Sequence, residues 1–274
     1  MTLRFAKYHG IGNDFVVVEG PLMDAARAVR ICDRRRGVGA DGVLTILPPE
    51  TPGAVARMHI YNSDGSVAAM CGNGIRCVAK DLVPRLRSAS GGATPGTNGS
   101  DLEMVIDTDA GPKRCVAHLD AAGEAQAITV EMGPGKLLGE EDFTVGGERL
   151  RAVRVSMGNP HAVFFDAPTR ERASAVGPLV EKAVPGGVNA GFSRPGADGI
   201  DLVVWERGAG LTEACGTGAC AAAVAAVSRG LAPAGRPVEV RLPGGPLQIT
   251  VAPDLASVRM RGPAALTYRG ETEL

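Results

Sequence analysis

Short apolar runs separated by glycine and proline dominate the chain. The runs are rich in Val, Ile and Thr, which is typical of β-strands bounded by turns. The clearest of them predict strands near residues 102–107, 113–119, 238–242 and 247–251. The first two are joined through Asp-Ala-Gly-Pro and the last two through Pro-Gly-Gly-Pro. The pattern therefore predicts one strand pair in each half of the chain.

Three segments have the composition of helices. Residues 219–227, Ala-Cys-Ala-Ala-Ala-Val-Ala-Ala-Val, are apolar almost all round, and a helix without a polar face is normally buried. Because the side chains are small, strands can approach this helix from every side. We predict helices at about Asn73–Leu86 and Thr217–Arg229, and an amphipathic helix within Pro168–Val184.

The two halves of the chain repeat one pattern. Residues 58–74 match residues 202–218 without a gap, and Cys71 and Cys215 lie 144 positions apart. Gly12-Asn13 matches Gly158-Asn159 at nearly the same offset, which favours a duplicated unit. We therefore expect an α+β fold of two pseudo-symmetric, mainly antiparallel β-domains, each wrapped around a central α-helix.

The expected domains follow from this repeat. The first spans residues 1–118 and contains the helix after Cys71, and the second spans residues 119–262 and contains the helix after Cys215. We expect residues 263–274 to pack back onto the first domain. The stretch Ser88–Ser100 has no apolar content to bury, so we interpret it as a disordered surface loop.

Charge and hydropathy narrow the class of protein. The 274 residues include 29 Lys and Arg and 30 Asp and Glu, a net charge of −1, without a long run of one sign. This balance gives no reason to expect nucleic acid or an anionic membrane as a partner. The longest apolar stretch, residues 218–227, is far shorter than the ~20 residues of a membrane helix, and the N-terminus has no signal-peptide pattern. We expect a soluble, cytoplasmic protein.

The chain has six cysteines, which we expect to be reduced thiols in the cytoplasm. They are Cys32, Cys71, Cys77, Cys115, Cys215 and Cys220. None forms a C-x-x-C pair and no His lies close to either closely spaced pair, so a structural zinc site fits poorly and we expect no metal. A single cysteine is most often a small buried core residue, and we interpret all but Cys71 and Cys215 in this way or as support for the site.

Cys71 and Cys215 differ from the others because each immediately precedes Gly-x-Gly at the start of a predicted helix. Helix-end N–H groups can lower a thiol pKa from about 8.5 into roughly the 3.5–7.5 range. The amides of Gly72, Asn73, Gly216 and Thr217 could hold one bound carboxylate. One Cys-Gly-x-Gly is a weak signal, but two copies at equivalent repeat positions favour catalysis. We predict a thiolate/thiol pair that inverts an α-carbon by removing a proton from one face and delivering one to the other.

A series of motifs in this chain resembles the diaminopimelate epimerase family across almost its whole length. They are His9-Gly-Ile-Gly-Asn-Asp-Phe, Asp33-Arg through Gly39-Ala-Asp-Gly, Tyr61-Asn-Ser-Asp-Gly-Ser, Met70-Cys-Gly-Asn-Gly-Ile-Arg-Cys, Met157-Gly-Asn-Pro-His, Val188-Asn-Ala, Glu206-Arg-Gly-Ala-Gly and Ala214-Cys-Gly-Thr-Gly-Ala-Cys. The resemblance implies interconversion of LL- and meso-2,6-diaminopimelate without a cofactor, in lysine and cell-wall precursor synthesis. It also implies two β-domains with the active site between them, and it suggests a homodimer, although no residue pattern demonstrates one.

The resemblance also assigns residues. Cys71 and Cys215 become the acid-base pair, and Gly72, Asn73, Gly216 and Thr217 hold the reacting amino-acid end. The residues implied to bind the rest of the substrate are Asn13, Asn62, Asn159, Asn189, Glu206 and Arg207. Arg can grip a carboxylate, Glu can accept from an ammonium and Asn can do either. For Asn13 or Asn159 taken alone, a turn residue is the better interpretation. His161 is interpreted either as support near the substrate ammonium or as a structural histidine.

Three features depart from the family pattern. Gly42 stands where many members have Gln, Leu211 where an acidic residue is common, and Ser88–Ser100 looks longer than usual. Gly37-Val-Gly-Ala-Asp-Gly does not fit the dinucleotide fingerprint and is interpreted as a turn.

The main alternative function is a proline or hydroxyproline racemase. A phenazine-pathway isomerase fits less well because that group lacks the paired cysteines, and a redox or metal protein would be expected to have C-x-x-C spacing.

Overall fold

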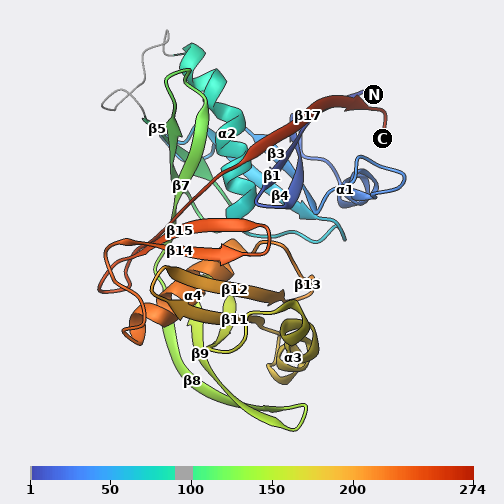
Figure 1. Cartoon of the computed structure of the whole chain (residues 1–274). Coiled ribbons are helices and arrows are strands. Elements are labelled where there is room, and N and C mark those ends of the chain that lie inside the picture. Colours follow the sequence, from blue (N-terminus) through green and yellow to red (C-terminus); the bar gives the residue numbers. More distant parts are fainter. Residues whose placement is uncertain (1, 90–100) are drawn as a thin grey trace. The chain divides into compact units, whose positions relative to one another are not determined.

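The computed structural model describes residues 2–89 and 101–274, which form two compact units (Figure 1). The first unit runs to Val130 and includes Gly262–Leu274, and the second is Glu131–Arg261. We expected the division near residue 118, but strand β7 (Ala125–Gly133) pairs with β6 (Lys113–Leu119), which carries the first unit on to Val130. Within the described ranges no helix is both long and apolar enough to cross a membrane.

The first unit is a mainly antiparallel sheet. Its other strands are β1 (Leu3–Gly10), β2 (Asn13–Glu19), β3 (Gly42–Leu47), β4 (Ala56–Asn62), β5 (Asp101–Asp107) and β17 (Ala265–Thr272). Their order is β17-β1-β2-β3-β4-β5-β6-β7. Only the β2–β3 and β4–β5 pairs among them are parallel. The C-terminal strand thus closes the chain back onto β1.

The second unit repeats this arrangement. Its strands are β8 (Lys136–Val145), β9 (Glu148–Ser156), β10 (Pro160–Phe164), β11 (Asn189–Gly196), β12 (Gly199–Glu206), the short β13 (Gly210–Leu211), β14 (Pro237–Leu242), β15 (Gly245–Val251) and β16 (Val258–Gly262). Apart from β13, the order is β8-β9-β10-β11-β12-β14-β15-β16. The parallel pairs, β10–β11 and β12–β14, stand at the same places in the order as those of the first unit. The duplication predicted from sequence is therefore present in the topology.

One helix in each unit lies among the strands. Helix α2 (Gly72–Ala89) packs against β1, β2, β3, β5 and β6, and helix α4 (Gly216–Ser228) packs against β9, β10, β11, β12, β14 and β15. Every residue of α4 from Gly218 to Ala226 is buried, as its all-round apolar pattern predicted. The fold class inferred from the sequence, two mainly antiparallel β-units each around a central helix, is confirmed.

Two further helices cover the outside of the sheets. Helix α1 (Ala25–Cys32) packs on β3 and β4, and helix α3 (Arg170–Ala183) packs on β8, β11, β12 and β13. The helix expected within Pro168–Val184 is thus confirmed, with Thr169 as its N-cap. Ser88, which we assigned to a loop, instead belongs to α2 and bonds the Pro84 carbonyl. Ala89 also belongs to α2, and the other residues of that expected loop, 90–100, lie outside the described residues.

Candidate active site

Cys71 lies directly before α2, where its carbonyl accepts the first helical bond from the Ile75 N–H at 2.9 Å. The Gly74 N–H points at the Cys71 sulfur from 3.4 Å. A Cβ on Gly74 would lie 3.1 Å from Leu44 Cδ2 and 3.4 Å from Cys71 Cβ. Glycine therefore allows the first turn of the helix to sit tightly against both the thiol and the sheet.

Cys215 has the same geometry at the start of α4. It is the N-cap residue, and its sulfur accepts from the Gly218 N–H at 3.3 Å. Its carbonyl accepts from the Ala219 N–H at 2.9 Å. A Cβ on Gly218 would lie only 3.0 Å from Val204 Cγ2 and 3.1 Å from the Cys215 sulfur. Both predicted catalytic thiols thus receive a helix-end amide three residues further along the chain.

The electrostatic environment of Cys215 differs from the one predicted. Only 3% of the residue is exposed. Burial raises the pKa of the Cys215 thiol well above its usual value, and the charge of Glu206 and a hydrogen bond with it raise the pKa further. The Thr217 hydroxyl and the Gly218 N–H lower the pKa but do not reverse the shift. Our expectation of a lowered pKa is wrong for Cys215, because desolvation and a neighbouring carboxylate outweigh the helix end.

Asn13 lies at the end of the β1–β2 turn, where Ile11 and Gly12 both have positive φ, 48° and 90°. This turn brings the Asn13 side chain to α2, where its Oδ1 accepts from Asn73 Nδ2 at 3.1 Å. On its other side Asn13 Nδ2 donates to Asp41 Oδ2 at 2.8 Å. The structure therefore brings two predicted site residues together, beside the helix start that carries Cys71.

Asn159 occupies the equivalent place in the second unit. Its Nδ2 donates to Thr217 Oγ1 at 3.2 Å, and its Oδ1 lies 3.0 Å from His161 Nε2. Thr217 Oγ1 in turn lies 3.7 Å from the Cys215 sulfur. Because the Thr217 oxygen accepts from Asn159, its own hydrogen is available to the sulfur. A continuous polar chain thus runs from His161 to Cys215.

His161 is a neutral imidazole in this chain of bonds. The residue is 1% exposed, and burial, followed by the charge of Arg207, lowers its pKa to about 3. A neutral ring that faces an amide oxygen must carry its hydrogen on that nitrogen, so Nε2 donates to Asn159. The other end of the same amide, Nδ2, faces Thr217.

The remaining predicted residues of the second unit lie close to this chain. Asn189 pairs with His161 across β10–β11 and donates from Nδ2 to the Pro160 carbonyl at 2.9 Å. Its Oδ1 accepts from the Arg207 N–H at 3.0 Å. Asn189 therefore uses its side chain to hold the backbone around His161 and Arg207. Glu206, at the end of β12, accepts from the Thr212 hydroxyl at 2.6 Å.

Asn62, Gly42 and Leu211 have local explanations. Asn62 donates to the Ser66 hydroxyl at 2.9 Å in the turn after β4. Its strand partner is Gly42, where a Cβ would lie 2.7 Å from the Tyr61 carbonyl oxygen, so a side chain here would require the backbone to shift. Leu211 packs against the apolar cluster between α3 and the second sheet. At this position, where an acidic residue is common in the family, the chain therefore has an apolar packing contact.

The other four cysteines are buried thiols. Burial raises the pKa of Cys32 to about 11 and those of Cys77 and Cys115 to about 12. Their assignment to the core therefore agrees with the structure. Across residues 2–89 and 101–274, no cluster of three or more His, Cys, Asp or Glu side chains is arranged to hold a metal ion.

Comparison with known proteins places this geometry in a family. The family profile for diaminopimelate epimerase matches residues 5–138 and 153–267. The chain belongs to the diaminopimelate epimerase family. It is 41% identical over 294 aligned residues to the diaminopimelate epimerase of Synechococcus elongatus, covering 100% of this chain and 99% of the relative. It is also 38% identical over 293 residues to that of Stutzerimonas stutzeri, covering 100% of both. Family membership makes the chain an isomerase.

Solved structures share the fold with much lower identity. A hydroxyproline epimerase from Agrobacterium vitis superposes with a TM-score of 0.72 at 18% identity, covering 99% of this chain and 92% of that one. A phenazine biosynthesis protein of the PhzF family from Bacillus anthracis gives a TM-score of 0.74 at 16% identity, covering 100% of both. The hydroxyproline epimerase and the PhzF-family protein therefore share the fold of this chain.

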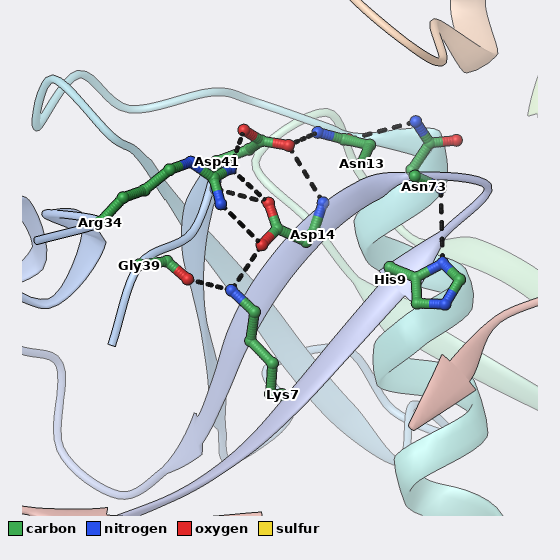
Figure 2. Close-up of polar contacts among 9 residues, drawn as sticks. Lys7, His9, Asn13, Asp14, Arg34, Gly39, Asp41 and Asn73 are labelled. Carbon is green, nitrogen blue, oxygen red and sulfur yellow. Dashed lines mark hydrogen bonds and ion pairs between the residues drawn. The ribbon is translucent and has the colours of Figure 1, made fainter. Parts of the chain in front are cut away.

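Sequence reasoning missed the group of charged residues around Asn13. Asp41 contacts Asn13 directly, and Arg34, Asp14 and Lys7 join it (Figure 2). Apart from Lys7, these residues stand in two of the motifs shared with the diaminopimelate epimerase family. Membership of these motifs is the sequence feature that could have pointed to them. No local pattern shows that residues 27 positions apart, Asp14 and Asp41, share one arginine.

Proposed function

We propose that this chain interconverts LL- and meso-2,6-diaminopimelate by proton transfer at one α-carbon, with Cys71 and Cys215 as the acid-base pair. The observation that carries the proposal is the duplicated thiol geometry. Each cysteine directly precedes a central helix, and each sulfur receives the amide of the glycine three residues on, at 3.4 and 3.3 Å. Packing alone does not require the same arrangement twice. Full-length similarity to diaminopimelate epimerases supports the choice of substrate.

The proposed reaction needs no external oxidant or reductant. The Cys71 thiolate removes the α-hydrogen as a proton, and the electron pair of the broken C–H bond stays on the α-carbon and its carboxylate. The Cys215 thiol delivers its proton to the opposite face, which inverts the centre and leaves Cys71 as thiol and Cys215 as thiolate. The reverse direction exchanges the two roles.

The surroundings of Cys215 suit the role of proton donor. Burial and Glu206 raise its pKa, so it starts as a thiol at neutral pH. Once its proton has left, the Thr217 hydroxyl and the Gly218 N–H stabilise the thiolate that remains. Hydrogen bonds that strengthen as charge develops lower the barrier more than bonds to the ground state.

The amides at the two helix starts are proposed to bind the reacting carboxylate. They are those of Gly72, Asn73, Gly216 and Thr217. We propose that the other polar residues recognise the ammonium groups and the distal carboxylate of the substrate. They are Asn13, Asn62, Asn159, Asn189, Glu206 and Arg207. In the same proposal the protein works as a cytoplasmic homodimer without a cofactor, an assignment supported by family resemblance.

Incubation with LL-diaminopimelate in deuterium oxide tests the reaction directly. We expect meso product that carries deuterium at a single α-position. Cys71→Ala and Cys215→Ala should each reduce turnover by at least about a hundredfold, since an acid or base of this kind contributes about 10²–10⁴-fold. The matched control is Cys115→Ala, a fully buried thiol of β6, which should retain turnover.

Two outcomes would contradict the proposal. Near-normal turnover in either site variant would exclude the two-thiol mechanism. Unchanged diaminopimelate together with racemisation of proline would support the proline racemase alternative instead. A further measurement tests whether the two sulfurs can meet. Mild oxidation should join the sulfurs of Cys71 and Cys215 and inactivate the enzyme, and a reductant should restore its activity.

A further inference from the structure

The charged cluster beside Asn13 determines which way the Asn13 amide points. Asp41 Oδ2 lies 2.8 Å from Asn13 Nδ2 and also accepts from the Asp14 backbone N–H at 3.0 Å. An ionised carboxylate can only accept hydrogen bonds, so the NH₂ end of Asn13 must face Asp41. The Asn13 oxygen is then turned toward Asn73, where it accepts from Nδ2 at 3.1 Å (Figure 2).

Asp41 is itself held by its neighbours. Arg34 Nη2 lies 2.7 Å from Asp41 Oδ1, and the same guanidinium bonds both oxygens of Asp14, at 2.7 and 3.1 Å. Lys7 Nζ lies 2.6 Å from Asp14 and also bonds the Gly39 carbonyl. The cluster therefore joins two cations to two anions, and it fixes Asp41 from the side away from Asn13 (Figure 2).

Stability alone does not explain the ion pair that holds Asp41. The side chains of Arg34 and Asp41 are 58% and 42% exposed. Ion pairs with this exposure typically contribute about 0–1 kcal/mol. The hydrogen bonds of the pair do, however, leave Asp41 Oδ2 in one position, and this atom is the acceptor for Asn13.

In the second unit an asparagine at the equivalent position also lies between two polar groups, but the groups differ. Asn159 is the repeat equivalent of Asn13, and Thr217 is the equivalent of Asn73. The Asn159 amide points the other way: its oxygen accepts from His161, and its NH₂ donates to Thr217. In both units an outer group contacts the turn asparagine, and the asparagine contacts the second residue after the cysteine.

We propose that Asp41 is a positioning residue of the first half-site, which fixes the amide orientation of Asn13 and through it the side chain of Asn73. This inference rests on the proposed function, in which Asn13 and Asn73 bind the substrate. Without the carboxylate, the Asn13 amide can rotate and present its NH₂ to the NH₂ of Asn73. Substrate binding should weaken while the fold is retained.

The decisive variant is Asp41→Ala in the full chain. Alanine offers no acceptor to the Asn13 NH₂ or to the Asp14 backbone N–H, both of which bond Asp41 Oδ2 in the wild-type chain. The carboxylate that sets the Asn13 amide is then absent, and the amide can flip. We expect KM for diaminopimelate to rise by about 10- to 100-fold, the range of a lost hydrogen bond to a charged group.

Matched variants separate positioning from general damage. Arg34→Gln removes the ion pair but keeps the carboxylate that accepts from Asn13, so its KM should rise much less. Asp142→Asn breaks an exposed ion pair with Arg149 on β8–β9 and should leave KM unchanged. If Asp41→Ala does not fold, Asp41→Glu retains a charge for Arg34 but displaces the acceptor, and the same rise in KM is expected.

The outcomes distinguish this inference from the proposed function. A KM within about twofold of wild type in the folded Asp41 variant would overturn the positioning role. If the wild-type chain does not convert diaminopimelate, the proposed function fails, and NMR of the side-chain amides decides the inference alone. The Asn13 and Asn73 amide signals should then shift in Asp41→Ala but not in Asp142→Asn, and unchanged signals would refute it.

Discussion

Acid should destabilise the second unit through one side chain, His161. Its pKa in the folded chain is about 3, whereas an unperturbed histidine titrates near 6.5. Between these values the unfolded chain binds a proton that the folded chain excludes, so stability falls as the pH falls. Above about pH 6.5 the titration of His161 does not change the free energy of unfolding. Below about pH 6.5 it lowers the free energy of unfolding by about 1.4 kcal/mol per pH unit. At about pH 5 the loss should be about 2 kcal/mol.

The assay is urea unfolding followed by the fluorescence of Trp205, the single tryptophan of the chain. Trp205 lies on β12 in the same unit as His161 and packs against its apolar cluster, so it reports the relevant unfolding. The matched variant is His161→Gln, whose side-chain NH₂ can donate to Asn159 but does not titrate. Between about pH 7.5 and about pH 5, wild type should lose about 2 kcal/mol more than the variant. Equal losses in the two proteins would refute the assignment of His161 as a buried neutral ring.

Three further substitutions test the packing and the charged cluster. Gly177→Ala would place a Cβ 2.4 Å from the Trp205 side chain, and overpacking should cost about 1–3 kcal/mol by tryptophan fluorescence, although alanine favours helix. Gly42→Ala would place a Cβ 2.7 Å from the Tyr61 carbonyl oxygen, and a lower thermal midpoint by circular dichroism is expected, whereas a higher one would contradict the explanation of this glycine. Burial raises the pKa of Asp14, but bonds from an arginine and a lysine outweigh it and hold the pKa well below its usual value. Asp14→Asn should therefore cost about 3 kcal/mol at neutral pH and lose less stability than wild type below about pH 4.

The fold was predictable because its signals are local or repeated. The all-round apolar pattern of residues 219–227 predicted a buried helix, and the helix is buried. The match of residues 58–74 to 202–218 predicted a duplicated unit, and the strand order repeats. Hydrophobic period and internal repetition are properties of the chain itself, so they can be read without coordinates.

The electrostatics of the site were not predictable in the same way. The Cys215 pKa depends on how much of the thiol is buried and on a carboxylate, Glu206, that only the packing of β12 on α4 brings near. The role of Asp41 depends on the parallel pairing of β2 and β3, which brings Asn13 beside it. Such distances between residues far apart in sequence are set by tertiary structure, and composition or spacing does not contain them.

The composition of α4 also limits how this half of the protein can evolve. From Ala221 to Ala226, five of the six side chains are single methyl groups that touch their surroundings. Gly135 approaches the remaining one, Val224, so closely that a Cβ there would lie 2.5 Å from a methyl carbon. Because the methyl groups are closely packed, both larger and smaller residues at these positions should lower the stability of the fold. Directed-evolution libraries should therefore recover few changes along this helix, and useful diversity should come instead from the turns that precede it.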